Sequence, residues 1–154
     1  MNSENSEDSN EIGQTRDITI LIVEDDSPLL EFFSTILRRE GYKVLKAQNG
    51  VEALEIAKSR PDERIDILLS DVAMPYRGGV QLAVNLLEIQ PHIQVLLTSA
   101  MPFQEISNQC GTKFHPAFLA KPFSVSNLTA KIKTIVESTS IYLGPHARGY
   151  PGRS

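Results

Sequence analysis

The chain alternates between short continuous apolar runs and longer segments in which apolar residues recur at helical spacing. Continuous apolar runs of about four to eight residues are typical of parallel strands that are covered on both faces of a sheet. We expect strands of this kind over residues 17–23, 42–47, 65–70, 93–98 and 117–120.

Start and stop signals predict helices between these strands. Ser27 as N-cap, with Pro28 at the first helical position, predicts where the first helix begins, and Gly41 predicts its end. Asn49 precedes a short second helix, which Pro61 ends.

The sequence predicts the three later helices with signals of different strength. A third helix is expected over residues 80–89, after a loop in which Gly78 and Gly79 are available for unusual backbone angles. Residues 101–111 show only a thin apolar stripe, so we expect a short or mobile helix there. Ser124 is predicted to cap the last helix.

Five strands that alternate with helices predict an α/β fold with a doubly wound parallel sheet and helices on both faces. Because crossover connections are right-handed, few topologies remain. The flavodoxin-like strand order 2-1-3-4-5 fits best, and it makes strands 1 and 3 neighbours at the switch point of the sheet.

Several predicted strands run directly into a polar residue that can do chemistry. Glu24-Asp25-Asp26 follows the first strand, and Asp71, Ser99 and Lys121 lie at or near the ends of the third, fourth and fifth. Ligands of open α/β sheets bind at the carboxyl ends of the strands, so we expect these residues to meet. Converging carboxylates need a cation, and an all-oxygen site favours Mg²⁺ or Mn²⁺ over zinc. For the acidic triplet by itself, a loop that merely caps the next helix explains the residues about equally well.

Composition and charge narrow the class of protein. With 154 residues and a net charge of -4, the chain has the size of one domain and no electrostatic reason to bind nucleic acid directly. Cys110 is the only cysteine, so an intrachain disulfide is excluded. The sequence has no apolar run of membrane-spanning length and no secretory signal, and we expect a cytoplasmic protein.

Both ends of the chain are polar or rich in turn residues. Residues 1–16 are acidic and almost free of large apolar groups, which predicts a disordered N-terminal tail. We expect the folded domain to cover residues 17–137 and residues 138–154 to form a flexible C-terminal tail, too short for an output domain.

Four segments in order resemble the receiver domain of two-component response regulators, in particular its single-domain, chemotaxis-regulator-like type. They are residues 20–26 (ILIVEDD), 66–75 (DILLSDVAMP), 95–100 (VLLTSA) and 119–123 (LAKPF). The resemblance covers about residues 17–137.

The resemblance implies a role for each of these polar residues. Asp71 would be the phosphoacceptor, and Glu24, Asp25, Asp71 and the backbone carbonyl of Ala73 would hold Mg²⁺. Lys121 would contact a phosphoryl oxygen, and the Lys121–Pro122 bond would be cis.

Two further positions match the residues that switch such domains between states. Ser99 would be the switch hydroxyl, with Thr98 as its rival, and Phe118 would be the aromatic that rotates inward on activation. An ordinary core phenylalanine is the alternative for Phe118. Ala73 and Met101 stand where many receivers carry polar groups that orient the attacking water, which suggests a long-lived aspartyl phosphate.

The expected function is a stand-alone receiver that is phosphorylated by a histidine kinase or phosphotransfer protein and signals by binding a downstream protein target. We expect a monomer or weak dimer without turnover activity beyond its own phosphorylation and dephosphorylation, and no membrane contact. The alternative is a pseudo-receiver that acts as a constitutive binding module. An aspartate-nucleophile phosphatase is disfavoured because Ala73 stands where a second acid is needed.

Overall fold

The computed structural model describes residues 17–73, 78–111 and 114–142, with only the backbone described for residues 139–142. Five strands and five helices alternate along the chain. The strands are β1 (Thr19–Val23), β2 (Lys43–Ala47), β3 (Ile67–Asp71), β4 (Gln94–Ser99) and β5 (Ala117–Ala120). The helices are α2 (Ser27–Arg39), α3 (Gly50–Ser59), α4 (Gly79–Ile89), α5 (Phe103–Cys110) and α6 (Val125–Tyr142).

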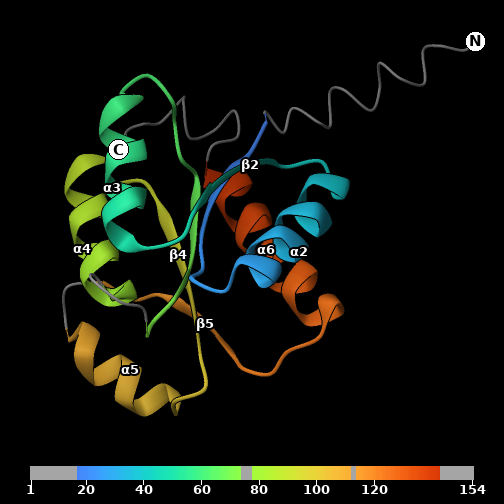
Figure 1. The fold of residues 1–154 in the computed structure, drawn as a ribbon, viewed down its shortest axis with the longest axis vertical. Coiled ribbons are helices and arrows are strands. Elements are labelled where there is room, and N and C mark those ends of the chain that lie inside the picture. The colour runs from blue at the N-terminus through green and yellow to red at the C-terminus, as the bar shows by residue number, and fades with distance from the viewer. Residues whose placement is uncertain (1–16, 74–77, 112–113, 143–154) are drawn as a thin grey trace, which may run out of the picture.

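The strands form one parallel sheet in the order β2-β1-β3-β4-β5, which confirms the predicted topology. Helices α3, α4 and α5 cover one face, and α2 and α6 cover the other (Figure 1). The predicted strands are correct to within about two residues at each end. Asp71 is the last residue of β3, and Ser99 is the last residue of β4. The backbone of each residue is therefore part of the sheet.

The sheet has a separate apolar core on each face. Successive residues of a strand point to opposite faces, so Leu21 and Val23 of β1 enter the core under α3, α4 and α5. Ile20 and Ile22 enter the core under α2 and α6. All five residues of β1 are buried, which is why the strand is a continuous apolar run and not an alternating one.

The N-cap of the first helix lies one residue earlier in the sequence than predicted. Asp26, not Ser27, is the N-cap of α2, and its Oδ1 accepts a hydrogen bond from the backbone N–H of Leu29 at 3.2 Å. Ser27 is the first helical residue, and its hydroxyl instead accepts a hydrogen bond from the side chain of Gln48. Gly41 follows the helix with φ at 100°, as its predicted position required.

The last two helices differ in length. Helix α5 is short, with eight residues, and only Ile106 and Cys110 are buried. Ser124 caps α6 as predicted, accepting a hydrogen bond from Asn127 N–H at 3.0 Å. Helix α6 continues to Tyr142, five residues past the expected end of the domain at 137. Within the described ranges, no helix has both the length and the apolar character that a membrane span requires.

Replacing Asn49 with alanine should destabilise the fold through the start of α3. The Asn49 side chain accepts a hydrogen bond from Glu52 N–H at 2.8 Å, and loss of such a cap costs about 1 kcal/mol. Urea unfolding should show this loss for Asn49→Ala, whereas Asn49→Asp, which keeps the acceptor, should stay close to the wild type. Equal stability of all three proteins would contradict the assigned cap.

Candidate functional site

The predicted site residues come from neighbouring strands that end at the same edge of the sheet. Val23 lies beside Ser70 in the register of β1 and β3, so Glu24 and Asp25 follow β1 next to Asp71. Ser99 lies beside Ala120, which places Lys121 directly after the neighbouring end of β5. The parallel arrangement therefore brings together residues that are about 100 positions apart in the chain.

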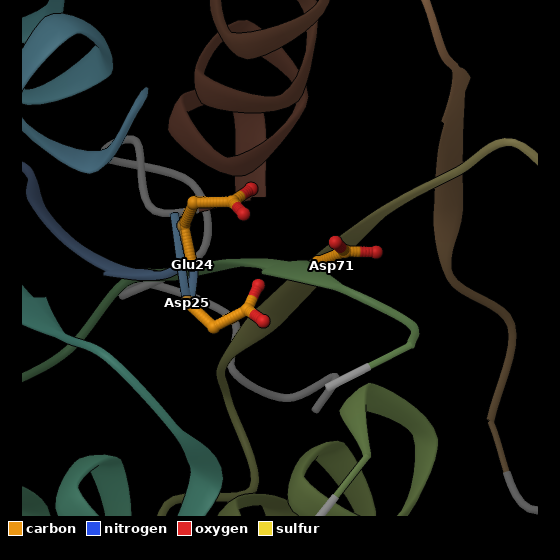
Figure 2. Close-up of side chains that lie close together, drawn as sticks. All are labelled: Glu24, Asp25 and Asp71. Atoms are coloured by element: carbon orange, nitrogen blue, oxygen red, sulfur yellow. The ribbon is translucent and has the colours of Figure 1, made fainter. Parts of the chain in front are cut away.

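Three carboxylates converge at this edge. Glu24, Asp25 and Asp71 each offer one carboxylate oxygen, and these oxygens all lie within 4.8 Å of one another (Figure 2). Oxygens on one hard divalent ion lie at about 2.0–2.6 Å from it, so this spacing suits a shared ion. The acidic cluster is thus compatible with a divalent metal site. Asp26 lies outside the cluster, because its carboxylate caps α2.

Lys121 is the cation that the protein itself places among these acids. Its Nζ lies 2.9 Å from Asp71 Oδ2 and 3.6 Å from Glu24 Oε1. Burial works to lower the pKa of Lys121, but the hydrogen bond with Asp71 and the charges of Asp71 and Glu24 outweigh it and raise the pKa. Lys121 therefore stays an ammonium group at neutral pH.

One ammonium group does not fully compensate the acids. Burial raises the pKa of Glu24, and the nearby carboxylates of Asp71 and Asp25 act in the same direction. The charge of Lys121 and the N–H of Asp26, which donates to Glu24 Oε2 at 3.2 Å, act against this rise but do not cancel it. The charged form of Glu24 is therefore less favourable in the folded protein than in water, chiefly because the carboxyl is partly buried.

Both oxygens of the Asp71 carboxylate have a hydrogen-bond donor. Ala73 N–H donates to Oδ1 at 3.2 Å, and Lys121 donates to Oδ2 at 2.9 Å. These two bonds fix the orientation of the carboxylate at the end of β3. The predicted use of the Ala73 carbonyl as a metal ligand stays a prediction. The bond between Lys121 and Pro122 is cis, as the resemblance implied.

The two candidate switch hydroxyls lie on opposite sides of β4 near its end. Thr98 lies beside Asp71 in the register of β3 and β4. The position along β4 therefore does not by itself favour Ser99 over Thr98. The Ser99 hydroxyl accepts a hydrogen bond from Met101 N–H at 2.8 Å, and the Ser99 carbonyl accepts one from Lys121 N–H at 2.9 Å. Ser99 is thus bonded to the loops on either side of the site, and its switch role stays a prediction.

Phe118 of β5 is partly buried against the core under α3, α4 and α5. Its ring also contacts that of Phe103, the first residue of α5, with 5.3 Å between the ring centroids and 54° between the planes. The rotation of Phe118 on activation stays a prediction.

Gly79 is a site residue whose role was predicted wrongly. Neither Gly78 nor Gly79 has a positive φ; Gly78 is extended at φ -70°. Gly79 is required for close approach instead, because a Cβ there would lie 2.5 Å from the carbonyl oxygen of Asp71. Its N–H donates to Val72 O at 2.9 Å, so the start of α4 packs directly on the backbone of Asp71 and Val72. The available signal was a glycine at the first position of a helix, where other residues serve better.

Comparisons with known proteins agree with this geometry. Residues 20–133 match the family model described as response regulator receiver domain. The chain is 34% identical to the sensor kinase CckA of Brucella abortus over 119 residues, which are 77% of this chain and 12% of that protein. It is 27% identical to the response regulator receiver protein CpdR of the same organism, covering 76% of this chain and 95% of CpdR.

The solved structures give the same fold. The crystal structure of a response regulator receiver domain protein from Clostridium thermocellum superposes with a TM-score of 0.71 at 22% identity, over 80% of this chain and 98% of that one. The chain therefore belongs to the response regulator receiver domain family, with the flavodoxin-like fold that its sequence predicted.

Replacing Gly79 with alanine should distort the backbone that carries Asp71. The added methyl group would overlap the Asp71 carbonyl, and overpacking of this kind costs about 1–3 kcal/mol. Urea unfolding should show this loss. Gly78→Ala is the matched control, because its Cβ would meet Val72 O at 3.1 Å, and it should lose less. A Gly79→Ala protein as stable as the wild type would contradict the close approach.

Replacing Glu24 with glutamine should stabilise the protein in EDTA, and the gain should grow with pH. The folded protein raises the pKa of Glu24 above its ordinary value of 4.5, so the cost of the charge is absent below pH 4.5 and appears as the carboxyl ionises. Urea unfolding of both proteins between pH 4 and 8 measures this difference. Glu55→Gln, at an exposed position on α3, is the control and should show no such trend. A pH-independent difference for Glu24→Gln would contradict the assigned burial cost.

Proposed function

We propose that this chain is a phosphorylation-controlled receiver in which Asp71 accepts a phosphoryl group from a histidine kinase or a phosphotransfer protein. The observation that supports this most directly is the cluster of Glu24, Asp25 and Asp71, with Lys121 bonded to Asp71. Membership of the receiver family gives independent support.

The carboxylate cluster also supports a specific cofactor. We propose Mg²⁺, with Mn²⁺ as a substitute, held by Glu24, Asp25, Asp71 and the carbonyl of Ala73. All of these ligands are hard oxygens, which these ions prefer. When bound, the ion supplies positive charge that neutralises oxygens of the transferring phosphoryl group. It would also stabilise the charged form of Glu24, whose pKa is raised chiefly by burial.

The reaction itself needs little more than a positioned nucleophile. An Asp71 oxygen attacks the phosphorus atom of the donor, the bond from phosphorus to the donor atom breaks, and an aspartyl phosphate forms. Ala73 N–H and the Lys121 ammonium hold the carboxylate in one orientation before attack. Once the phosphoryl group is in place, Lys121 can pair with one of its oxygens, and Ser99 can donate a hydrogen bond to another.

Output would follow from a shift between two conformations and not from turnover chemistry. The phosphoryl group adds negative charge and strong acceptors next to Ser99 and Lys121, which favours a state in which both contact it. A downstream protein would bind this state. The match covers 95% of CpdR, so CpdR provides a precedent for a receiver protein of this size. The expected cytoplasmic location and the monomer or weak dimer stay predictions.

A constitutive binding module remains the second candidate, because membership of the family does not by itself require phosphorylation. The two functions differ at Asp71. A module of that kind would not need Lys121 within 2.9 Å of Asp71, nor three acids whose oxygens suit one ion. The geometry therefore favours the phosphorylated receiver.

Incubation with acetyl phosphate and Mg²⁺, followed by intact-mass measurement, tests the proposal. The wild-type protein should gain the mass of one phosphoryl group, because acetyl phosphate is a small-molecule donor that needs no docking surface. The Asp71→Asn protein should not gain this mass over the same time, since an amide is not a comparable nucleophile. The wild type in EDTA should also gain none.

Asp26→Asn is the matched control for loss of an acid at this edge. Asp26 lies next to the cluster but outside it, and asparagine keeps the acceptor that caps α2. This variant should be phosphorylated like the wild type. Absence of a mass gain in the wild type would favour the binding module, and an equal gain in Asp71→Asn would place the acceptor elsewhere.

A further inference from the structure

The segment that joins β4 to α5 is tied to the site at one end and to β5 at the other. At the site, the buried hydroxyl of Ser99 accepts a hydrogen bond from Met101 N–H at 2.8 Å. Two residues later, the Phe103 ring contacts the ring of Phe118. These two contacts bracket Pro102, the N-cap residue of α5, which provides no side-chain cap.

Helix α5 has few other anchors. Its buried side chains are Ile106 and Cys110, both in the middle or at the end of the helix, so its first turn is held mainly by the segment before it and by Phe103. Phe103 remains 49% exposed, although it is a large aromatic residue. The part of Phe103 that is covered includes its contact with Phe118, which gives the ring a defined partner.

Ser99 and Phe118 lie on the same face of the sheet. Leu97 pairs with Phe118 in the register, Leu97 and Phe118 both contact the core under α3, α4 and α5, and Ser99 is two residues after Leu97. A displacement of the Ser99 hydroxyl toward a phosphoryl group on Asp71 would break its bond to Met101 N–H. The segment 100–102 would then lose this bond, and the packing of Met101 on the core and the contact between Phe103 and Phe118 would oppose movement of the first turn of α5.

We infer that Phe103 is a positioning residue that holds Phe118 and the first turn of α5 in the unphosphorylated arrangement. This inference rests on the proposed function and adds to it the element that resists the switch. Phe103 touches neither the acids nor Lys121 in any described contact, so it acts through Phe118. Removal of its ring lowers the free energy needed to reach the phosphorylated arrangement and leaves the site itself unchanged.

The test measures the affinity of the full chain for beryllofluoride, a phosphoryl mimic, in saturating Mg²⁺ by calorimetry. Phe103→Leu should bind about 2- to 10-fold more tightly than the wild type, which corresponds to loss of one aromatic pair from the resting state. Phe103→Tyr keeps the ring and should bind like the wild type. Phe32→Leu removes a similarly exposed phenylalanine from α2, whose ring lies beside Phe33, and should leave the affinity unchanged.

A second measurement separates positioning from a general loss of stability. Without ligand, hydrogen exchange of the Met101 amide should be faster in Phe103→Leu, while amides of β1 keep the wild-type rate. Phe118→Leu should raise the affinity as well, and the double variant should gain no more than either single variant, because both remove the same contact.

The outcomes distinguish this inference from the proposed function. If the wild type binds beryllofluoride and Phe103→Leu binds equally or more weakly, the role assigned to Phe103 is overturned while the proposed function stands. Additive effects of Phe103→Leu and Phe118→Leu would also overturn it. If the wild type binds no beryllofluoride, the proposed function fails and this inference fails with it.

Discussion

The convergence of three carboxylates, one of them buried, at one edge of the sheet is the constraint on which the site depends. Glu24, Asp25 and Asp71 are held there by the ends of two paired strands, so they cannot separate without disrupting β1 or β3. Lys121 offsets part of this charge through its bond with Asp71, and burial keeps the pKa of Glu24 raised. The fold thus maintains a concentration of carboxylates that is compatible with a divalent ion.

The rest of the sheet provides the rigidity that this arrangement requires. Apolar cores lie on both faces. Strand β1 is buried from end to end, and β3 and β4 are buried except at Asp71 and Gln94. Close approach of Gly79 to the Asp71 carbonyl adds a direct contact between α4 and the acceptor segment. These features leave the carboxylate of Asp71 little freedom, which favours reaction with a donor of matching geometry.

Responsiveness lies on the opposite side of the site, where β4 continues into α5. Ser99 binds the following backbone through its hydroxyl, and α5 is short, with two buried side chains. In the proposed switch, the Ser99 hydroxyl would give up the hydrogen bond that it accepts from Met101 N–H and would donate a new one to a phosphoryl oxygen. Under our inference, the contact between Phe103 and Phe118 would limit how far this change reaches along α5 and β5. A rigid acceptor and a weakly anchored helix together suit a protein whose output is a change of surface.

The alternation of apolar runs and helical patterns was sufficient for the strand order, for both cores and for the position of the site, because parallel strands bring their carboxyl ends to one edge whatever the side chains. Asp71, Asp25, Glu24 and Lys121 could be placed for the same reason. The sequence left some local features open. Asp26 and Ser27 can both cap a helix. In the structure Asp26 is the cap, and the Ser27 hydroxyl accepts a hydrogen bond from Gln48, which lies in another segment. The function of Gly79, the register that sets Thr98 beside Asp71 and the pairing of Phe103 with Phe118 arise from segments that meet only in the folded chain, so only the tertiary structure could determine them.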